Sequence, residues 1–337
     1  MIISVVIPCR NEHEFIEECI SSVYLNVLDD LHQLNVIVVD GLSDDGTREI
    51  VQRIIPQYKN LYLVDNPQQL TPFAFNLGIH FCKADYYQIV GARQILSNNY
   101  LSESISIFLK DSSVWCVGGN VENFYINKTG EIISKAMSTS FGMGLGNFRT
   151  LVQSGYTDTV GTPMYPAFVF DKIGYFDEEL IRNQDDDFNF RVTKASGKIW
   201  FEKSISLKYY VRGNYRSLFK QFFQYGYWKV YVNKKHREVT TIRQLIPPLF
   251  VLYLFLLPIL FFISISVFSV FFSGIIFYFL LGIHFSIKKA STFIDFLGVF
   301  KTFPILHLSY GIGYFLGIIH FFILKKTPSN NQKSLSR

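Results

Sequence analysis

Residues 2–12 read IISVVIPCRNE, and residues 36–47 read VIVVDGLSDDGT. Each stretch opens with a short, β-branched apolar run and closes with polar turn residues, which predicts a buried strand of a parallel sheet. Helical patterns follow both stretches, over residues 14–27 and 47–55. Two consecutive strand–helix units place both turns at the carboxyl edge of one sheet, where open α/β folds bind ligands. The sequence therefore predicts an α/β domain with a small-molecule pocket, of a kind typical of nucleotide binding.

The same alternation continues along the chain. Residues 61–64 and 86–90 predict a third and a fourth strand, and the helix predicted between them, over 71–81, carries Asn76 and Gly78. Another strand is predicted over residues 197–201.

The C-terminal third of the chain has a different composition. Residues 245–285 contain no Asp, Glu, Lys or Arg, and a second apolar segment covers residues 303–324. One membrane span needs about 20 residues, so the first segment is long enough for two spans, with a turn among the serines between 264 and 273. We predict a globular domain over 1–240, a membrane-associated region of two to three hydrophobic helices over 241–326, and a polar tail over 327–337.

Basic residues flank these apolar segments. Lysines and arginines gather between 229 and 243, at 288–289 and at 325–326. Because cytoplasmic flanks are enriched in Lys and Arg, the first two helices are expected to form a hairpin in the inner (cytoplasmic) membrane, with the globular domain facing the cytoplasm. The basic pair at 325–326 also favours the cytoplasmic side, which a third complete span would not allow. Residues 303–324 therefore either form a re-entrant segment, lie in the membrane interface, or are an exception to the charge rule. Residues 289–302 mix apolar and basic side chains and fit the membrane surface.

Composition and motifs exclude several other classes of protein. The formal net charge of +5 is modest and no nucleic-acid-binding motif appears, so an anionic membrane lipid or a diphosphate ligand is the better partner for this charge. The four cysteines, at 9, 19, 82 and 116, match no zinc spacing and are predicted to be buried thiols.

The two opening turns also resemble those of a known family. Val6-Ile7-Pro8-x-x-Asn11-Glu12 and Val39-Asp40-x-x-Ser43-x-Asp45-Gly46-Thr47 resemble the start of family 2 glycosyltransferases. The resemblance implies a GT-A fold, with a mixed, mainly parallel sheet flanked by helices, and a UDP-sugar donor whose uracil imide binds Asp40. It also implies that Pro8, Asn11 and Glu12 line the base and the ribose. The predicted donor site further includes Arg10, Ser43, Asp45, Asn76, Gly91 and Arg93. The alternative is that Asp40 and Asp45 only cap the turn and the following helix.

One expected motif of this family is missing. The fourth strand of its members ends in Asp-x-Asp or Asp-x-His, which binds the divalent cation that bridges the donor phosphates, whereas here the matching residues are Gly91-Ala92-Arg93. Glycine has no side-chain ligand and a guanidinium repels a cation. Arg93 could instead neutralise the diphosphate, the site could have lost catalysis, or a metal could be held by residues 185–187 together with the phosphates.

An acidic run lies further along the chain. Asn183-Gln184-Asp185-Asp186-Asp187 precedes a helix predicted over residues 188–195, and three adjacent carboxylates could simply favour the positive end of that helix. This stretch resembles the motif Glu-Asp-x-Asp-Leu-x-x-Arg of family 2 enzymes when the arginine of the motif is aligned with Arg191. The resemblance makes Asp185 the catalytic base, with Asp186 as the runner-up and Asp187 at the second acidic position.

The region that follows resembles bacterial exopolysaccharide glycosyltransferases of the succinoglycan-biosynthesis type. In them the residues matching Arg212 and the helix with Gln224 and Trp228 close the pocket near the diphosphate and the acceptor. The alternative for the aromatic residues is packing along one face of an amphipathic helix. Residues 134–149, rich in Ser, Gly and Met, are predicted to form a mobile acceptor loop.

Together, these features predict an inverting hexosyltransferase. It would transfer a hexose from a UDP-sugar to an undecaprenyl-diphosphate-linked sugar during O-antigen, capsule or exopolysaccharide synthesis. The competing function is a catalytically silent sugar-nucleotide binder or scaffold subunit, which Gly91-Ala92-Arg93 would favour and the acidic run would not.

Overall fold

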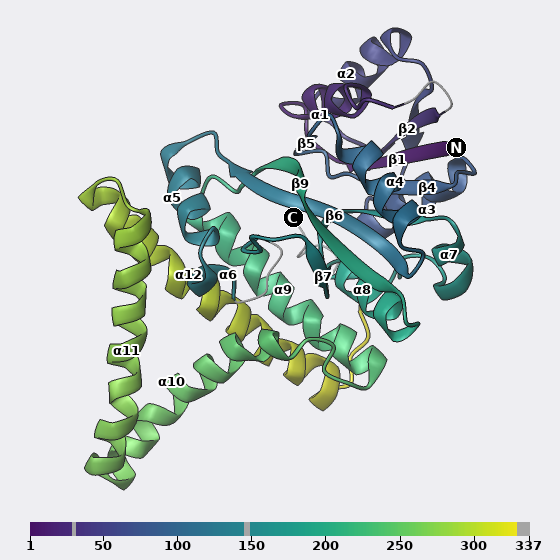
Figure 1. The fold of residues 1–337 in the computed structure, drawn as a ribbon. Helices are drawn as coiled ribbons and strands as arrows, with labels where there is room; N and C mark the ends of the chain where they lie inside the picture. Colours follow the sequence, from purple (N-terminus) through teal and green to yellow (C-terminus); the bar gives the residue numbers. More distant parts are fainter. Residues whose placement is uncertain (29–31, 145–148, 329–337) are drawn as a thin grey trace. The chain divides into compact units, whose positions relative to one another are not determined.

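The computed structural model describes residues 1–28, 32–144 and 149–328. Its contacts group the chain into two compact units, of which the first comprises residues 1–122 and 151–210 and the second comprises 123–150 and 211–337 (Figure 1). Each unit is described here by itself. The domain boundary at residue 240 stays a prediction, as does the polar tail, most of which lies outside the described residues.

Four strands form the parallel part of the sheet in the first unit. They are β1 (Ile2–Cys9), β2 (Gln33–Asp40), β3 (Leu61–Asp65) and β4 (Tyr86–Ile89), in the order β3-β2-β1-β4. Val5, Val6, Ile37 and Val38 are fully buried, as expected of strands covered on both faces. The register pairs Cys9 with Asp40 and Asp40 with Asp65, so the strand ends meet at one edge, as predicted.

The rest of the sheet is antiparallel. Its strands are β5 (Gln94–Leu96), β6 (Val114–Phe124), β7 (Gly155–Thr157), β8 (Gly161–Pro166) and β9 (Lys198–Tyr210). Strand β8 pairs with β4 and with β6, while β9 pairs with β5 and β7, which makes a mixed nine-stranded sheet within the described residues. The mixed sheet is confirmed, with its parallel strands confined to one half.

Helices complete the first unit. They are α1 (Ile16–Tyr24), α2 (Thr47–Ile54) followed by the 3-10 turn η1 (Ile55–Gln57), α3 (Thr71–Phe81), α4 (Tyr100–Lys110), α7 (Phe168–Ile173) and α8 (Gln184–Lys194). The predicted start of the last helix, at residue 188, is wrong: α8 begins four residues earlier. The acidic residues 185–187 therefore form its first turn, where carboxylates interact favourably with the helix dipole.

The second unit is helical. It contains α5 (Lys128–Met137), α6 (Ser140–Met143), α9 (Tyr215–His236), the 3-10 turn η2 (Ile242–Leu245), α10 (Ile246–Ile263), α11 (Ile265–Lys289) and α12 (Phe293–Ile318), which continues into the π-helical turn η3 (Ile319–Ile323).

The predicted mobile loop over residues 134–149 is largely replaced by the end of α5 and by α6. The Phe141 ring of α6 packs against Phe303 and Phe285, at centroid distances of 4.9 and 5.6 Å. This aromatic contact holds the segment against α11 and α12. Residues 145–148 of the predicted loop lie outside the described residues.

Among the described residues, three helices are long and apolar enough to cross a membrane: Ile242–Ile263, Ile265–Lys289 and Phe293–Ile323. The first two meet at Ser264, within the predicted turn region (Figure 1). In the third, 39% of the most apolar window is buried within the protein, against 17% and 6% in the first two. The predicted surface segment 289–302 mostly belongs to α12, and its apolar residues Phe293, Ile294 and Leu297 are exposed, so its position on a membrane surface stays a prediction.

Glycines let α12 approach its neighbours closely. A Cβ added at Gly313 would overlap the carbonyl oxygen of Phe223 in α9, and one added at Gly317 would lie 2.7 Å from the carbonyl oxygen of Tyr227. Gly311 has the same role against α10, where an added Cβ would lie 2.6 Å from the carbonyl oxygen of Pro247. These three glycines therefore permit close packing of α12 against α9 and α10.

We predict that Gly313→Ala destabilises the second unit, because the methyl group must push two backbones apart. Overpacking of this kind typically costs about 1–3 kcal/mol. Thermal unfolding of the full chain in detergent should show a lower midpoint. Gly282→Ala in α11 is the matched control, because its Cβ would meet side-chain rings and no backbone, with the movable ring of Phe300 nearest at 3.1 Å. Equal midpoints for the two variants would contradict the close contact between α9 and α12.

Candidate functional site

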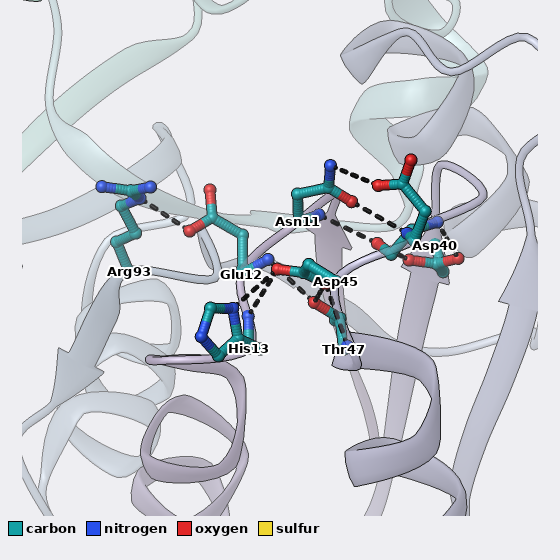
Figure 2. A network of polar contacts seen from close by, with 9 residues as sticks. Asn11, Glu12, His13, Asp40, Asp45, Thr47 and Arg93 are labelled. Carbon is teal, nitrogen blue, oxygen red and sulfur yellow. Dashed lines mark hydrogen bonds and ion pairs between the residues drawn. The ribbon is translucent and has the colours of Figure 1, made fainter.

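The two predicted turns are joined by side-chain hydrogen bonds. The Asn11 backbone N–H donates to Ser43 Oγ at 2.9 Å, and the Asn11 amide exchanges bonds of 2.8 and 3.1 Å with the carboxylate and the backbone N–H of Asp44 (Figure 2). Asn11 has a φ of 56°, a conformation that asparagine tolerates better than most residues. Asn11 and Ser43 therefore fix the two turns to each other.

Asp45 anchors the same edge from the start of α2. Its carboxylate accepts from the Thr47 backbone N–H at 3.0 Å, and it accepts from the backbone and ring nitrogens of His13 at 3.2 and 2.9 Å (Figure 2). Partial burial alone would raise the pKa of Asp45, but hydrogen bonds from Thr47 and His13 outweigh it and hold this pKa well below its usual range. Asp45 is thus a stably ionised clamp between the turns.

Asp40 is fully buried at the end of β2. Its carboxylate accepts hydrogen bonds from the backbone N–H and the hydroxyl of Ser43, and from Arg48 Nη1 at 2.7 Å. Burial alone would raise the pKa of Asp40, but these bonds lower it below its usual value. The carboxylate is thus enclosed by protein partners, and its predicted bond to a uracil imide requires Ser43 or Arg48 to give way.

Arg48 is a site residue that the sequence pattern did not single out. The same Nη1 atom lies 2.8 Å from Asp65 Oδ1, so Arg48 ties the ends of β2 and β3 together. Its position one residue after the motif Asp45-Gly46-Thr47 was the available signal.

Arg10, in the turn after β1, packs against Gly41, in the turn after β2. A Cβ at Gly41 would meet the Cδ of Arg10 at 3.2 Å, so glycine leaves the space that this side chain occupies. The Arg10 Nε and Nη1 atoms are buried and have no hydrogen-bond partner among the described residues. A buried, unpaired cation is costly, and Arg10 therefore suits an anionic or acceptor-rich ligand at this edge. Pro8 precedes it at the end of β1.

Arg93 follows the short turn after β4 and is held from two sides. Its Nε donates to Glu12 Oε2 at 2.6 Å (Figure 2). Its guanidinium lies over the Phe15 ring, 4.7 Å from the centroid. No protein hydrogen bond of the two terminal amino groups is found within the described residues. The planar fork is therefore oriented through Nε while its other donors remain for a ligand.

The residues present do not fit the divalent cation that the family motif would bind. Gly91 uses its backbone N–H to bond Gln94 Oε1 at 2.6 Å, and the second motif position is the cation Arg93. Among residues 1–28, 32–144 and 149–328, no three His, Cys, Asp or Glu side chains gather as a possible metal site.

The acidic first turn of α8 divides its three carboxylates between two environments. Asp185 is exposed and Asp186 is partly exposed, whereas Asp187 is only 1% exposed. Asp187 accepts from Arg191 Nε at 3.0 Å. These contacts bury and pair Asp187 and leave Asp185 and Asp186 accessible, and the catalytic role of the three carboxylates stays a prediction.

Arg191 also fixes the loop that leads into α8. Its two terminal amino groups donate to the carbonyl oxygens of Ile173 and Tyr175, at 2.6 and 2.8 Å. Beside it, Gln184 is buried, and its Oε1 has no hydrogen-bond partner among the described residues. Asp185 acts electrostatically on buried Tyr165, whose pKa is raised mainly by burial and further by neighbouring groups that include this carboxylate.

Asn76, a predicted donor-site residue, contacts the loop before α8. Its side chain is buried, donates to the Phe176 carbonyl and to Glu178 at 2.9 Å each, and accepts from the Phe176 N–H at 3.0 Å. Asn76 therefore holds the loop before α8.

The predicted acceptor-side residues belong to the second unit. Trp228 is 1% exposed and packs against Tyr231 and Phe321, at centroid distances of 6.2 and 6.0 Å, so its contacts are those of a core residue. Gln224 is likewise buried, and Arg212 is partly exposed. The packing alternative thus describes Trp228 better than a contact with the acceptor.

Comparisons with known proteins agree with this architecture. Residues 4–161 match glycosyl transferase family 2. Succinoglycan biosynthesis protein ExoA of Rhizobium meliloti is 27% identical over 247 residues, which cover 72% of this chain and 73% of that protein. The dolichyl N-acetyl-alpha-D-glucosaminyl phosphate 3-beta-D-2,3-diacetamido-2,3-dideoxy-beta-D-glucuronosyltransferase of Methanococcus voltae is 25% identical over 231 residues, which cover 66% of this chain and 71% of that protein.

The fold is shared with a solved structure, a mannosyltransferase from Pyrobaculum calidifontis in complex with GDP-Man and Mn2+. The TM-score is 0.63 at 14% sequence identity, and the match covers 93% of this chain and 86% of that one. The predicted GT-A fold with C-terminal apolar helices is therefore confirmed. Residues 4–161 of this chain are thus similar to family 2 glycosyltransferases, and the named relatives and the shared fold agree with that similarity.

Proposed function

We propose that this chain is an inverting hexosyltransferase that transfers a sugar from a UDP-sugar to a lipid-linked, undecaprenyl-diphosphate sugar during bacterial surface polysaccharide synthesis. The observation that carries the proposal is the exposed carboxylate of Asp185 at the N-terminus of α8, within the same compact unit as the two joined turns. The polysaccharide context is supported by the relative named for succinoglycan biosynthesis.

The donor diphosphate is assigned to the edge that carries Arg93. A planar guanidinium matches phosphate oxygens through paired hydrogen bonds, and Arg93 is already oriented by Glu12 and Phe15. Arg10 adds a second cation in the first turn, with buried nitrogens that have no partner among the described residues. Two arginines at one edge supply positive charge for the leaving diphosphate.

Asp185 is assigned as the general base. An inverting transfer needs a carboxylate that takes the proton from the acceptor hydroxyl as the new glycosidic bond forms and the bond to UDP breaks. Asp185 is the acidic residue of this helix turn with the most open surroundings, because Asp187 is committed to Arg191.

The acceptor is assigned to a membrane. Three helices of the second unit are long and apolar enough to span one, and the Methanococcus voltae relative is named for a dolichyl-linked acceptor. A cytoplasmic location of the catalytic unit at the inner membrane follows from the basic residues that flank the first two helices.

A second candidate function is favoured by one observation. Gly91-Ala92-Arg93 replaces the expected metal-binding motif, which also fits a catalytically silent sugar-nucleotide binder. The release of UDP from UDP-glucose, UDP-galactose and UDP-GlcNAc by the purified chain discriminates the two functions, because a silent binder releases none.

Asp185→Asn should lower turnover by about 10²- to 10⁴-fold, the usual contribution of a general base. UDP release in the presence of a lipid-diphosphate-GlcNAc acceptor measures the effect. The matched control is Asp186→Asn, one residue along the same helix turn, which should retain most of the activity. If the folded Asp185 variant turns over like the wild type, Asp185 is not the base; a selective loss in the Asp186 variant would move the role to that residue.

Turnover should persist in excess EDTA, because Arg93 takes the place of a metal at the diphosphate. Arg93→Met should weaken UDP binding by about 10- to 100-fold, since hydrogen bonds to charged groups contribute about 1.5–3 kcal/mol. Calorimetric titration with UDP in EDTA measures the binding. Arg93→Lys keeps the positive charge but lacks the planar guanidinium, and its affinity for UDP should lie between those of the wild type and Arg93→Met. Strict dependence of turnover on added manganese or magnesium contradicts the assignment of the diphosphate to Arg93.

A further inference from the structure

The pair Asn76 and Gly78 on α3 lies outside the proposed chemistry, yet both residues are engaged in close contacts. We infer that Asn76 is a positioning residue, which sets where the acidic N-terminus of α8 lies relative to the nucleotide-binding turn after β1. The inference rests on the proposed function, because it assumes that Asp185 works from that helix end.

Gly78 fixes α3 to the strand that carries the nucleotide-binding turn. A Cβ at Gly78 would overlap the side chain of Val6 and would lie 2.9 Å from its Cγ2. Val6 is fully buried in the middle of β1, and the same strand ends just before Arg10 and Asn11. Glycine therefore lets α3 rest directly on β1, so that the helix position is tied to the position of the turn.

Asn76, two residues earlier, connects α3 to the loop before α8. Its amide oxygen accepts from the Phe176 N–H at 3.0 Å, while its amide nitrogen donates to the Phe176 carbonyl and to Glu178 Oε1, both at 2.9 Å. These bonds join residues 100 and 102 positions apart in the chain. An asparagine amide has two N–H donors, so both are used here and neither is left for a donor sugar.

The same loop is attached to α8 from its other side. Arg191 binds the carbonyl oxygens of Ile173 and Tyr175, and the Phe176 ring stacks on Phe188 at a centroid distance of 4.4 Å. Phe176 also packs against Phe75, the neighbour of Asn76, at 4.8 Å. The loop over residues 173–178 is therefore a rigid connector between α3 and α8.

These contacts form one continuous chain, from the nucleotide-binding turn through β1, Gly78, Asn76 and the loop to the helix that begins with Gln184 and Asp185. A displacement of about 1 Å at a reacting group costs up to about 10²-fold in rate. Loss of the Asn76 amide should therefore lower the rate of transfer while leaving the nucleotide-binding turn, and with it the affinity for UDP, in place.

The test compares Asn76→Ala with Asn26→Ala in the full-length chain in detergent. Asn26 is also buried in the first unit, where its amide donates to the Ser22 carbonyl at 3.0 Å and accepts from the Leu101 N–H at 2.9 Å. It thus controls for the loss of a buried amide that does not contact the loop. The measurements are UDP affinity by calorimetry, kcat and KM from UDP release, and the ratio of donor hydrolysis to transfer.

For Asn76→Ala we expect kcat to fall about 10- to 100-fold, UDP affinity to stay within about threefold of the wild type, and the share of donor lost to hydrolysis to rise. Asn26→Ala should keep all three near wild-type values even if its melting temperature falls equally. A weaker UDP affinity without a change in kcat would make Asn76 a donor-binding residue and overturn the inference. Equal kcat values in the two variants would overturn it as well.

Two further measurements cover the case in which Asn76→Ala does not fold. Asn76→Asp keeps the acceptor for the Phe176 N–H but lacks both donors, and it should show the same selective loss of kcat. In the wild-type chain, the Phe176 amide should exchange slowly with deuterium, because Asn76 accepts its hydrogen bond. Fast exchange at this amide contradicts the contact itself.

Asp185→Asn, measured in parallel, separates this inference from the proposed function. If Asp185→Asn is inactive and Asn76→Ala is fully active, only the positioning role of Asn76 fails. If Asp185→Asn is fully active, the assigned base is wrong, and a loss of kcat in Asn76→Ala would then not arise through that residue.

Discussion

The ion pair between Arg191 and Asp187 is the contact on which the acidic helix depends. A buried carboxylate is tolerated only when it is paired and hydrogen-bonded, and Arg191 meets this need while its two terminal amino groups bind the carbonyl oxygens of Ile173 and Tyr175. One guanidinium thus neutralises the buried end of the acidic run and fixes the loop before α8. Because Asp187 is engaged in this way, Asp185 is left exposed at the helix N-terminus, where an ionised carboxylate is stabilised.

The edge that carries the two joined turns is likewise held by hydrogen bonds between its own polar groups. The two turns are joined by hydrogen bonds of Asn11, Ser43 and Asp45. The Asp40 carboxylate is enclosed by Ser43 and Arg48. The turns are therefore set before a ligand arrives, which lowers the ordering cost of binding. Arg48 is neutralised by Asp40 and Asp65, whereas Arg10 and Arg93 are the cations assigned to the diphosphate. Glu12 binds Arg93 (Figure 2), and the Phe15 ring lies against its guanidinium.

The sequence predicted the parallel strands, α3 and the turn at Ser264 because each depends on local pattern: buried β-branched runs, helical periodicity and charge-free length. It misplaced the start of α8, because the helical pattern was taken to begin at Phe188, whereas the helix already includes Gln184 and the three aspartates. It also missed the helices within residues 134–149, which are held by aromatic contacts with α11 and α12. The contacts of Asn76 and Asp187 could not be predicted, for a related reason. A motif gives residue type and spacing, but the partners of Asn76 lie about 100 positions away, and whether Asp187 is buried depends on packing.

The account as a whole requires a nucleotide diphosphate to lie between the Arg93 edge and the start of α8. A cryo-EM or crystal structure of the full-length chain with bound UDP tests this requirement most directly. We predict that the β-phosphate lies within hydrogen-bonding distance of the terminal amino groups of Arg93, with the Asp185 carboxylate facing the phosphate end of the nucleotide across a sugar-sized gap. A nucleotide bound elsewhere, or an Asp185 carboxylate directed away from it into solvent, would contradict the account.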